Sequence, residues 1–303
     1  MKTCSRFSVL IALVWLSLGS FALLAQTDKV TINLTPKPNQ ITHSRMTQEM
    51  DFDVTFEGNV PPEVAGMGPM KVTIKVSSAL TQKAGTPDTQ GRLAAETTYD
   101  QMSTEMSLNG NSMPMGDTGG NIVGKKFTVV FDSQGKIVDV KMPTEMGEMS
   151  EIVKQMMSGL TIGGLPQSAL AVGETVSTPF SMTLPLPIPN ANPLNFEGQT
   201  KSKLVSLTKD GADQLAKLDQ VFEGKLVSSV DIPSPAGNIK VNIDAKMGGT
   251  GNVDLNLDKR LMKTSQSQIT LDATINLVGD VGGVQLPNVK LHGTIKVTMT
   301  QTN

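Results

Sequence analysis

The feature that most constrains this chain is a two-residue alternation of apolar and polar side chains over most of its length. Successive side chains of a β-strand point to opposite faces, so each alternating segment predicts a strand with one apolar face. Thr, Lys and Asn fill the other positions, which is typical of antiparallel sheets with one solvated side. The alternating segments are Met46–Phe56, Met70–Leu80, Phe127–Phe131, Val176–Leu184, Ile239–Met247, Val253–Leu257, Ile269–Leu277 and Val289–Met299.

Short turns are predicted between several of these segments. Asp or Ser side chains can hydrogen-bond the backbone of a turn, and Gly supplies a positive φ. The predicted tight turns are Ser133-Gln134-Gly135, Asp210-Gly211 and Asp258-Lys259-Arg260. Stretches rich in Pro and Gly predict longer loops at 58–69, 109–121, 184–193, 231–238 and 279–288. Pro185 should end the strand before it, because proline cannot donate to a strand ladder.

One segment has helical rather than strand periodicity. Thr144 is a suitable N-cap, Gly159 a suitable end, and apolar residues recur between them at spacings of three and four. This amphipathic helix, at about 144–158, is expected to cover the apolar face of the sheet. Its stripe is the candidate apolar groove: Met146, Met149, Ile152, Val153, Met156 and Met157. The predicted fold is therefore mainly β, a strongly curved antiparallel sheet or open barrel with one covering helix.

The N-terminal residues carry an export signal. Lys2 and Arg6 precede an apolar run that reaches Leu24, and Ala25 offers a small residue for cleavage. Residues 1–25 therefore predict a secretory signal peptide, with a membrane anchor as the alternative. Residues 26–303 are then expected to form a single antiparallel β domain, exported to the periplasm or the extracellular space, without a stable transmembrane anchor after cleavage.

Composition excludes several classes of function. The single cysteine, Cys4, lies within the predicted signal peptide, so the exported chain has no disulfide and no thiol chemistry. The formal net charge is −2, which gives no basic surface for nucleic acid. With two histidines there are too few ligands for the usual zinc constellations, and no cofactor is predicted.

Some polar residues could form a site, yet each has a simpler explanation. His43 and His292 could meet as a metal pair, but two separate surface histidines are the favoured interpretation. Glu145, Glu148 and Glu151 fall on the polar side of the predicted helix, where negative charge near the N-terminus is favourable.

A second carboxylate pattern imitates the start of a calcium loop. Asp254, Asn256 and Asp258 have the alternating spacing of such a loop, but Lys259 stands where Gly is required. The polar side of a strand explains the same spacing.

Methionine is unusually frequent, with 18 residues in the chain and many between Met67 and Met157. Three explanations stay open: filling of a core that is short of aromatics, an adaptable apolar binding surface, or Cu(I) binding by thioethers. Met113 and Met115 are the residues that most favour copper, because they lie close together in a loop segment.

The order of these pieces resembles a known arrangement. It consists of Phe131–Ile137, the amphipathic helix, Leu165-Pro166, Val172-Gly173-Glu174-Thr175-Val176, the Asp210-Gly211 turn and a final Gly249-Thr250-Gly251 hairpin. This arrangement resembles an uncharacterised family of exported bacterial proteins, known only as a domain of unknown function. At the level of fold it is also similar to the open half-barrels of bacterial lipoprotein carriers. The family implies no catalytic residues.

Function is predicted mainly by exclusion. The expected function is a non-enzymatic exported binding or structural module whose partner is a lipid or another envelope protein. The alternatives are a periplasmic Cu(I)-binding protein and a glycan-acting enzyme that uses carboxylates alone. The enzyme is weakened by the scarcity of aromatic residues for stacking on sugars, since Tyr99 is the only tyrosine.

Overall fold

The structure is a computed structural model. It describes residues 29–58, 68–113, 122–133, 137–142, 165–166, 168–184, 194–234, 237–278, 280–281, 284–285 and 287–303. The predicted signal peptide lies outside the described residues, and so does the predicted helix with Met146, Met149, Ile152, Val153, Met156 and Met157.

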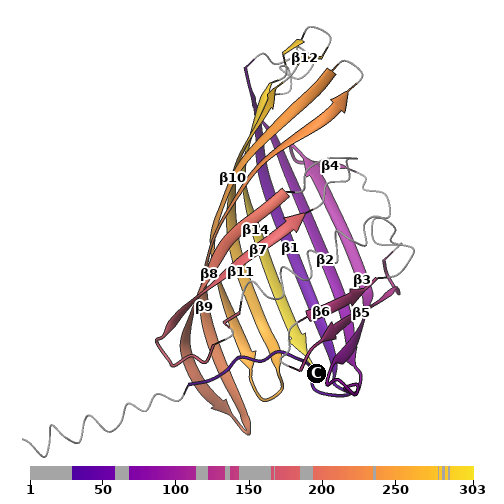
Figure 1. Cartoon of the computed structure of the whole chain (residues 1–303), viewed down its shortest axis with the longest axis vertical. Helices are drawn as coiled ribbons and strands as arrows, with labels where there is room; N and C mark the ends of the chain where they lie inside the picture. Colours follow the sequence, from indigo (N-terminus) through magenta and orange to yellow (C-terminus); the bar gives the residue numbers. More distant parts are fainter. Residues whose placement is uncertain are drawn as a thin grey trace, which may run out of the picture.

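All regular secondary structure in the described part of the chain is β, as the alternation predicts (Figure 1). The strands are β1 (Ile41–Glu57), β2 (Met70–Ala84), β3 (Leu93–Leu108), β4 (Asn111–Met113), β5 (Lys126–Phe131), β6 (Ile137–Lys141), β7 (Thr175–Leu184), β8 (Leu194–Asp210), β9 (Asp213–Ser234), β10 (Gly237–Asn256), β11 (Leu261–Val278), β12 (Asp280–Val281), β13 (Val284–Gln285) and β14 (Asn288–Thr302). The prediction of a mainly antiparallel β fold is confirmed.

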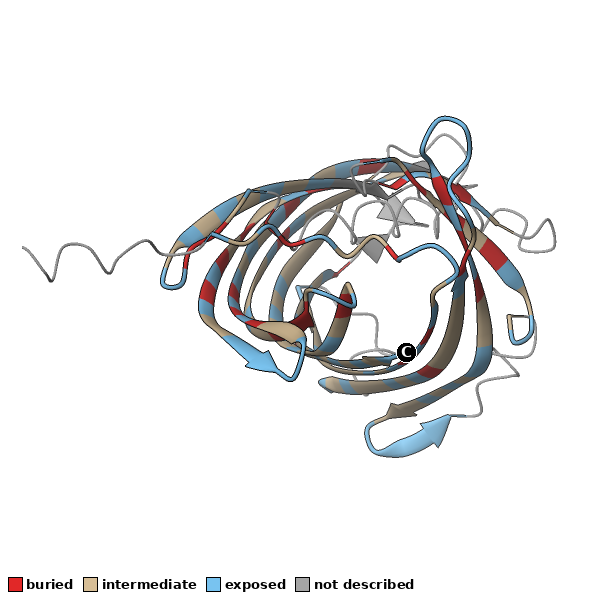
Figure 2. Ribbon diagram, turned by 90° about the horizontal axis from the view of Figure 1, so that it is seen from below, coloured by how far each residue is buried: buried red, intermediate tan, exposed pale blue. Residues whose placement is uncertain are grey.

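Twelve of these strands form one antiparallel sheet that does not close into a ring. Its order is β6-β5-β3-β2-β1-β14-β11-β10-β9-β8-β7, with β4 paired to β3, while β12 and β13 form a separate hairpin. The sheet curls strongly around a central axis (Figure 2). The C-terminal strand β14 lies between β1 and β11, so it joins the N-terminal strands to the later hairpins.

The alternation assigns each strand one inner and one outer face. Directly paired residues of neighbouring strands share a face, so the register identifies complete cross-strand rows. Phe52, Gly293 and Leu271 form one such row on the inner face. Their sequence neighbours Asp53, His292 and Asp272 form a row on the outer face.

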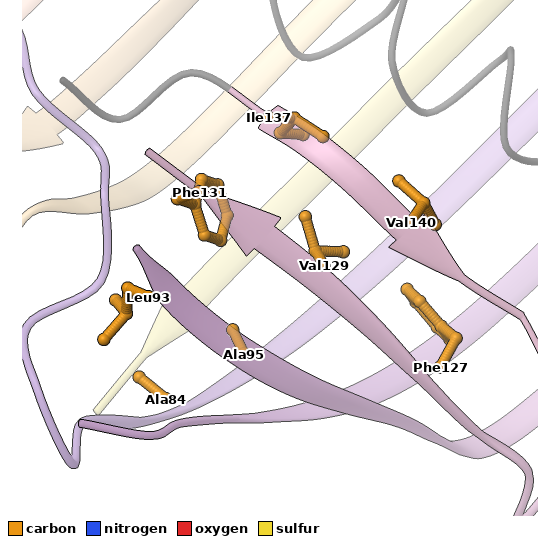
Figure 3. Packing of buried hydrophobic residues seen from close by; sticks show 8 residues of the cluster. All are labelled: Ala84, Leu93, Ala95, Phe127, Val129, Phe131, Ile137 and Val140. Carbon is orange, nitrogen blue, oxygen red and sulfur yellow. The ribbon is translucent and has the colours of Figure 1, made fainter. Parts of the chain in front are cut away.

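Two apolar clusters occupy the end of the sheet where β1 begins and β14 ends, called here the lower end. The first lies on β3, β5, β6 and the end of β2 (Figure 3). Its buried members are Ala84, Leu93, Ala95, Phe127, Val129, Phe131, Ile137 and Val140. The ring of Tyr99 packs on this cluster, 5.6 Å from that of Phe127.

The second cluster is covered by residues 29–40, called here the N-terminal strap. Ile32 packs in it, and Val30 forms an antiparallel bridge with Leu170. The buried sheet residues of the cluster are Leu204, Ala216, Leu218, Val253 and Leu255. Figure 1 shows the strap crossing the lower end of the sheet, from β8 and β9 to the start of β1.

Four β-bulges interrupt the alternation. In each, one strand carries one residue more than its partner: Asp100 in β3, Val138 in β6, Val205 in β8 and Lys263 in β11. Three of them adjoin a single cross-strand row, Gln101–Ala79–Arg45–Thr300–Thr264–Asp254–Lys217–Ser206. A bulge bends its strand and increases its local twist, so three strands carry this local distortion at the same level, next to the lower end of the sheet.

The structure confirms some predicted connections and corrects others. The turns at Asp210-Gly211 and Asp258–Arg260 are present, with φ of 62° at Gly211 and 54° at Arg260. The predicted long loop at 231–238 is wrong, because β9 continues to Ser234 and β10 begins at Gly237. The predicted hairpin at Gly249-Thr250-Gly251 is also wrong. These residues lie inside β10, where small residues relieve crowding between strands rather than turn the chain.

Candidate ligand-binding face

The inner face of the sheet carries three consecutive apolar rows above the sealed lower end. They are Met106–Ile74–Met50–Ile295–Ile269, Leu108–Val72–Phe52–Gly293–Leu271 and Met70–Val54–Leu291–Ala273. These fourteen residues, from β3, β2, β1, β14 and β11, are called here the inner wall. Only apolar side chains and one glycine form it, so it offers a continuous hydrophobic surface.

The inner wall is incompletely buried. Gly293 is buried, whereas the other thirteen residues are all partly exposed. At the lower end, by contrast, Leu204, Leu218 and Leu255 are 0% exposed. A surface of large apolar side chains that remains partly exposed is typical of a binding site for an apolar ligand or partner.

The inner face is also uncharged. No charged residue occupies the described inner positions of β1, β2, β10, β14 or β11 from Ser265 onward. Lys, Asp and Glu of these strands lie on the outer face, as in the Glu49–Lys75 ion pair of 3.2 Å. An ionised group entering the inner face would therefore find no counter-charge there.

Two glycines on the inner face leave room for phenyl rings. A Cβ atom added at Gly293 would overlap the ring of Phe52, its cross-strand partner. A Cβ atom at Gly198 would lie 2.5 Å from Cζ of Phe180 and 2.9 Å from Cα of Gly224. The absence of a side chain at each of these glycines makes room for the ring and for close contact with the neighbouring strand.

A row with several uncharged polar residues borders the inner wall on the side of the lower end. This polar row is Thr104–Val76–Gln48–Val297–Ser267–Gly251–Gln220–Ser202. Thr104, Gln48 and Ser267 are partly exposed, whereas Gln220 is buried and donates to Ser202 Oγ at 3.2 Å. Adjacent rows of the inner face therefore differ: the row through Met50 is apolar, and the next row, through Gln48, can form hydrogen bonds.

The outer face presents a different candidate, a polar hollow of about 410 Å³. Its charged lining residues are Asp53, Asp244, Lys246, Asp272, Lys290 and His292. Nδ1 of His292 lies 2.6 Å from Oδ1 of Asp272, and this hydrogen bond, together with the charge of Asp272, raises the pKa of the imidazole. Both side chains are more than 60% exposed. Solvent screens the interaction between such exposed charges. The hollow is therefore explained by charged side chains of neighbouring strands that face water.

The two histidines do not come together. His43 lies near the start of β1, where its Nδ1 is 3.0 Å from Oγ1 of Thr81. His292 is paired with Asp53, ten residues further along β1, which places the histidines about 33 Å apart. The prediction of two separate surface histidines is confirmed. Among the described residues, no group of three His, Cys, Asp or Glu side chains is arranged to hold a metal ion.

The residues that imitate a calcium loop are engaged separately. Asp254 accepts a hydrogen bond from Thr264, Asn256 donates to Asp213, and Asp258 accepts from the backbone N–H of Gln214. Three different partners hold three side chains, so they do not converge on a common ion position. Glu145, Glu148 and Glu151 lie outside the described residues.

The methionines that the structure describes divide between the inner wall and its surroundings. Met50, Met70 and Met106 belong to the wall. Met113 pairs with Met106 and is 41% exposed, while Met115 lies outside the described residues. Sequence reasoning placed the apolar site on the predicted helix and missed the sheet wall, although the alternation in β1 and β14 already contained its residues.

Comparisons with known proteins identify no family for this chain. No family model matches the chain, and no curated protein is similar to it in sequence. Among solved structures, Pseudomonas aeruginosa OccK11 (OpdR) aligns over 90% of this chain and 100% of its own, with 5% identity and a TM-score of 0.16. A similarity this weak carries no argument about fold or function. In the described part of the chain, no helix has the length and hydropathy needed to cross a membrane.

Proposed function

We propose that this chain is an exported, non-enzymatic binding module that holds an apolar ligand against its inner wall. The observation that carries the proposal is the set of thirteen apolar side chains, twelve of them Val or larger, that share one face, are partly exposed, and have no charged neighbour among the described residues of that face. Burying such a surface contributes roughly 25 cal/mol per Å², so an apolar ligand would be held without any specific polar contact.

Two expectations from the sequence support this function. The predicted helix at 144–158 has an apolar stripe of four methionines, and thioether side chains adapt to ligands of varied shape. We propose that its residues Met146, Met149, Ile152, Val153, Met156 and Met157 complete the site. The predicted signal peptide agrees with a role in the periplasm or outside the cell, and we propose a lipid or envelope protein as partner.

The proposal is tested first on the native protein. Native mass spectrometry of protein purified from its own envelope should show an adduct that organic extraction removes. The extracted protein should then bind a neutral apolar fluorophore, N-phenyl-1-naphthylamine, saturably. A protein without an adduct that also fails to bind the probe would contradict the proposal.

A pair of matched variants locates the site. Ile74→Thr/Ile295→Thr changes two residues that flank Met50 on the inner wall, and Val227→Thr makes the same kind of change on the outer face, where Val227 is 69% exposed. The wall variant should weaken probe binding by about tenfold or more, since each exchange replaces an apolar ethyl group with a hydroxyl. Val227→Thr should leave binding unchanged. Equal affinities in the two variants would place the ligand elsewhere.

A further inference from the structure

The inner face is apolar along most of its length and polar at one end, which suits a ligand whose two ends differ. This inference rests on the proposed function. On β11, inner positions 269, 271, 273, 275 and 277 are all apolar, and on β10 so are the paired positions 241, 243 and 245. Eight residue steps along a strand span about 26 Å. One acyl chain of a bilayer spans roughly 15 Å, half of the hydrocarbon core, so the strip is longer than one acyl chain laid along the strands. Within the strip, Leu271 and Ala273 also pack against the buried cluster of Phe196, Leu226 and Ala245.

The two ends of this apolar strip differ. Toward the lower end it meets the polar row, where Gln48, Ser267 and Thr104 are partly exposed. The amide of Gln48 can both donate and accept hydrogen bonds, and a hydroxyl can do the same. These groups match an ester, amide or hydroxyl, which also carry donors and acceptors without net charge.

An ionised headgroup does not match the polar row. Nothing on the described inner positions of the neighbouring strands carries a charge, and the basic residues nearest in sequence, such as Lys296, face outward to Glu49 and Gln268. A carboxylate or phosphate placed at the polar row would lose hydration without gaining a counter-ion. We infer that the module selects a neutral amphiphile, with its acyl chain along the inner wall and its uncharged polar group at the polar row.

The test compares two compounds with the same chain. Mono-hexadecanoyl glycerol and hexadecanoate at pH 8, both below their micelle concentrations, compete with the neutral fluorophore N-phenyl-1-naphthylamine for the extracted protein. The neutral compound should displace the probe at a concentration about tenfold lower, because the ionised carboxylate cannot enter the polar row without a cost.

A variant at the polar row connects this preference to a residue. Gln48→Leu should reduce the preference to about threefold or less while probe binding persists, because the main hydrogen-bonding side chain is gone. Gln268→Leu is the matched control: Gln268 is exposed on the outer face of β11, paired with Lys296, and its variant should keep the full preference.

The outcomes separate the two claims. If both compounds displace the probe equally, or if Gln48→Leu keeps the full preference, the inference about a neutral headgroup is overturned and the apolar site stands. If the probe does not bind at all, the proposed function itself fails.

Discussion

Gly293 offers the sharpest test of how this sheet is built. It lies on the inner face of β14 opposite Phe52, and it is buried. In Gly293→Ala the new Cβ would lie 2.7 Å from Cε1 of Phe52 and 2.8 Å from the backbone oxygen of Asp51. Real Cβ atoms do not approach other atoms so closely, so the ring and the neighbouring strand must move.

The size of the effect follows from two opposing contributions. Overpacking of this kind costs about 1–3 kcal/mol. Replacing Gly by Ala in a strand recovers about 0.5–1 kcal/mol through the entropy of the unfolded chain. The net expectation is a loss of about 0–2.5 kcal/mol in the free energy of unfolding, centred near 1 kcal/mol, together with a weaker apolar probe site, since Phe52 belongs to the inner wall.

Gly248→Ala is the matched control. A Cβ at Gly248 would meet only the backbone oxygen of Phe222, at an ordinary distance of 4.0 Å, so this variant should be neutral or slightly more stable. Urea unfolding followed by circular dichroism suits the comparison, because the only tryptophan, Trp15, lies in the predicted signal peptide. Equal unfolding midpoints for the two variants would refute the argument that Phe52 and Gly293 pack against each other.

Three further predictions follow from the described contacts. Ile32→Ala should lower the free energy of unfolding by about 2–5 kcal/mol in urea unfolding, because Ile32 is 9% exposed within the cluster under the N-terminal strap; an unchanged midpoint would show that the strap does not seal the lower end. Asp272→Asn should lower the pKa of His292 in an NMR titration. The raised pKa favours the protonated folded form, so its small stabilisation is present below the ordinary pKa and disappears as pH rises through the folded pKa; an unaltered titration would contradict the hydrogen bond to Asp272. Met106→Leu/Met113→Leu should leave Cu(I) affinity, measured against a competing chelator, low and unaltered, and a loss of tight binding in this variant would favour copper after all.

The sequence predicted the strands and their faces well, because a period of two is a direct consequence of pleating. In β1 the parity of Met46, Met50 and Phe52 is the parity of the inner face along the described strand. The turn at Asp210-Gly211 was equally predictable, since Gly211 needs its positive φ.

Other features depend on contacts between distant residues and left no local signal. Val138 and Val205 are apolar residues within strand segments, yet they are 50% and 37% exposed because each is the extra residue of a bulge. A single chain does not reveal which residue its partner strand will leave unpaired. The pairing of β1 with β14, some 250 residues apart in the sequence, was likewise invisible to local patterns.

The position of the bulges explains why the sealed end and the candidate site occupy different parts of one sheet. Three bulges adjoin the row that contains Thr300, and next to them lie the clusters that the strap and β6 cover. Beyond that row, toward Phe56, the alternation in β1, β2 and β14 continues without interruption, so every apolar side chain stays on the inner face. The bulges therefore lie next to the closed lower end of the sheet. Along the inner wall the strand pairing is regular, and its partly exposed apolar side chains share one face where a ligand could bind.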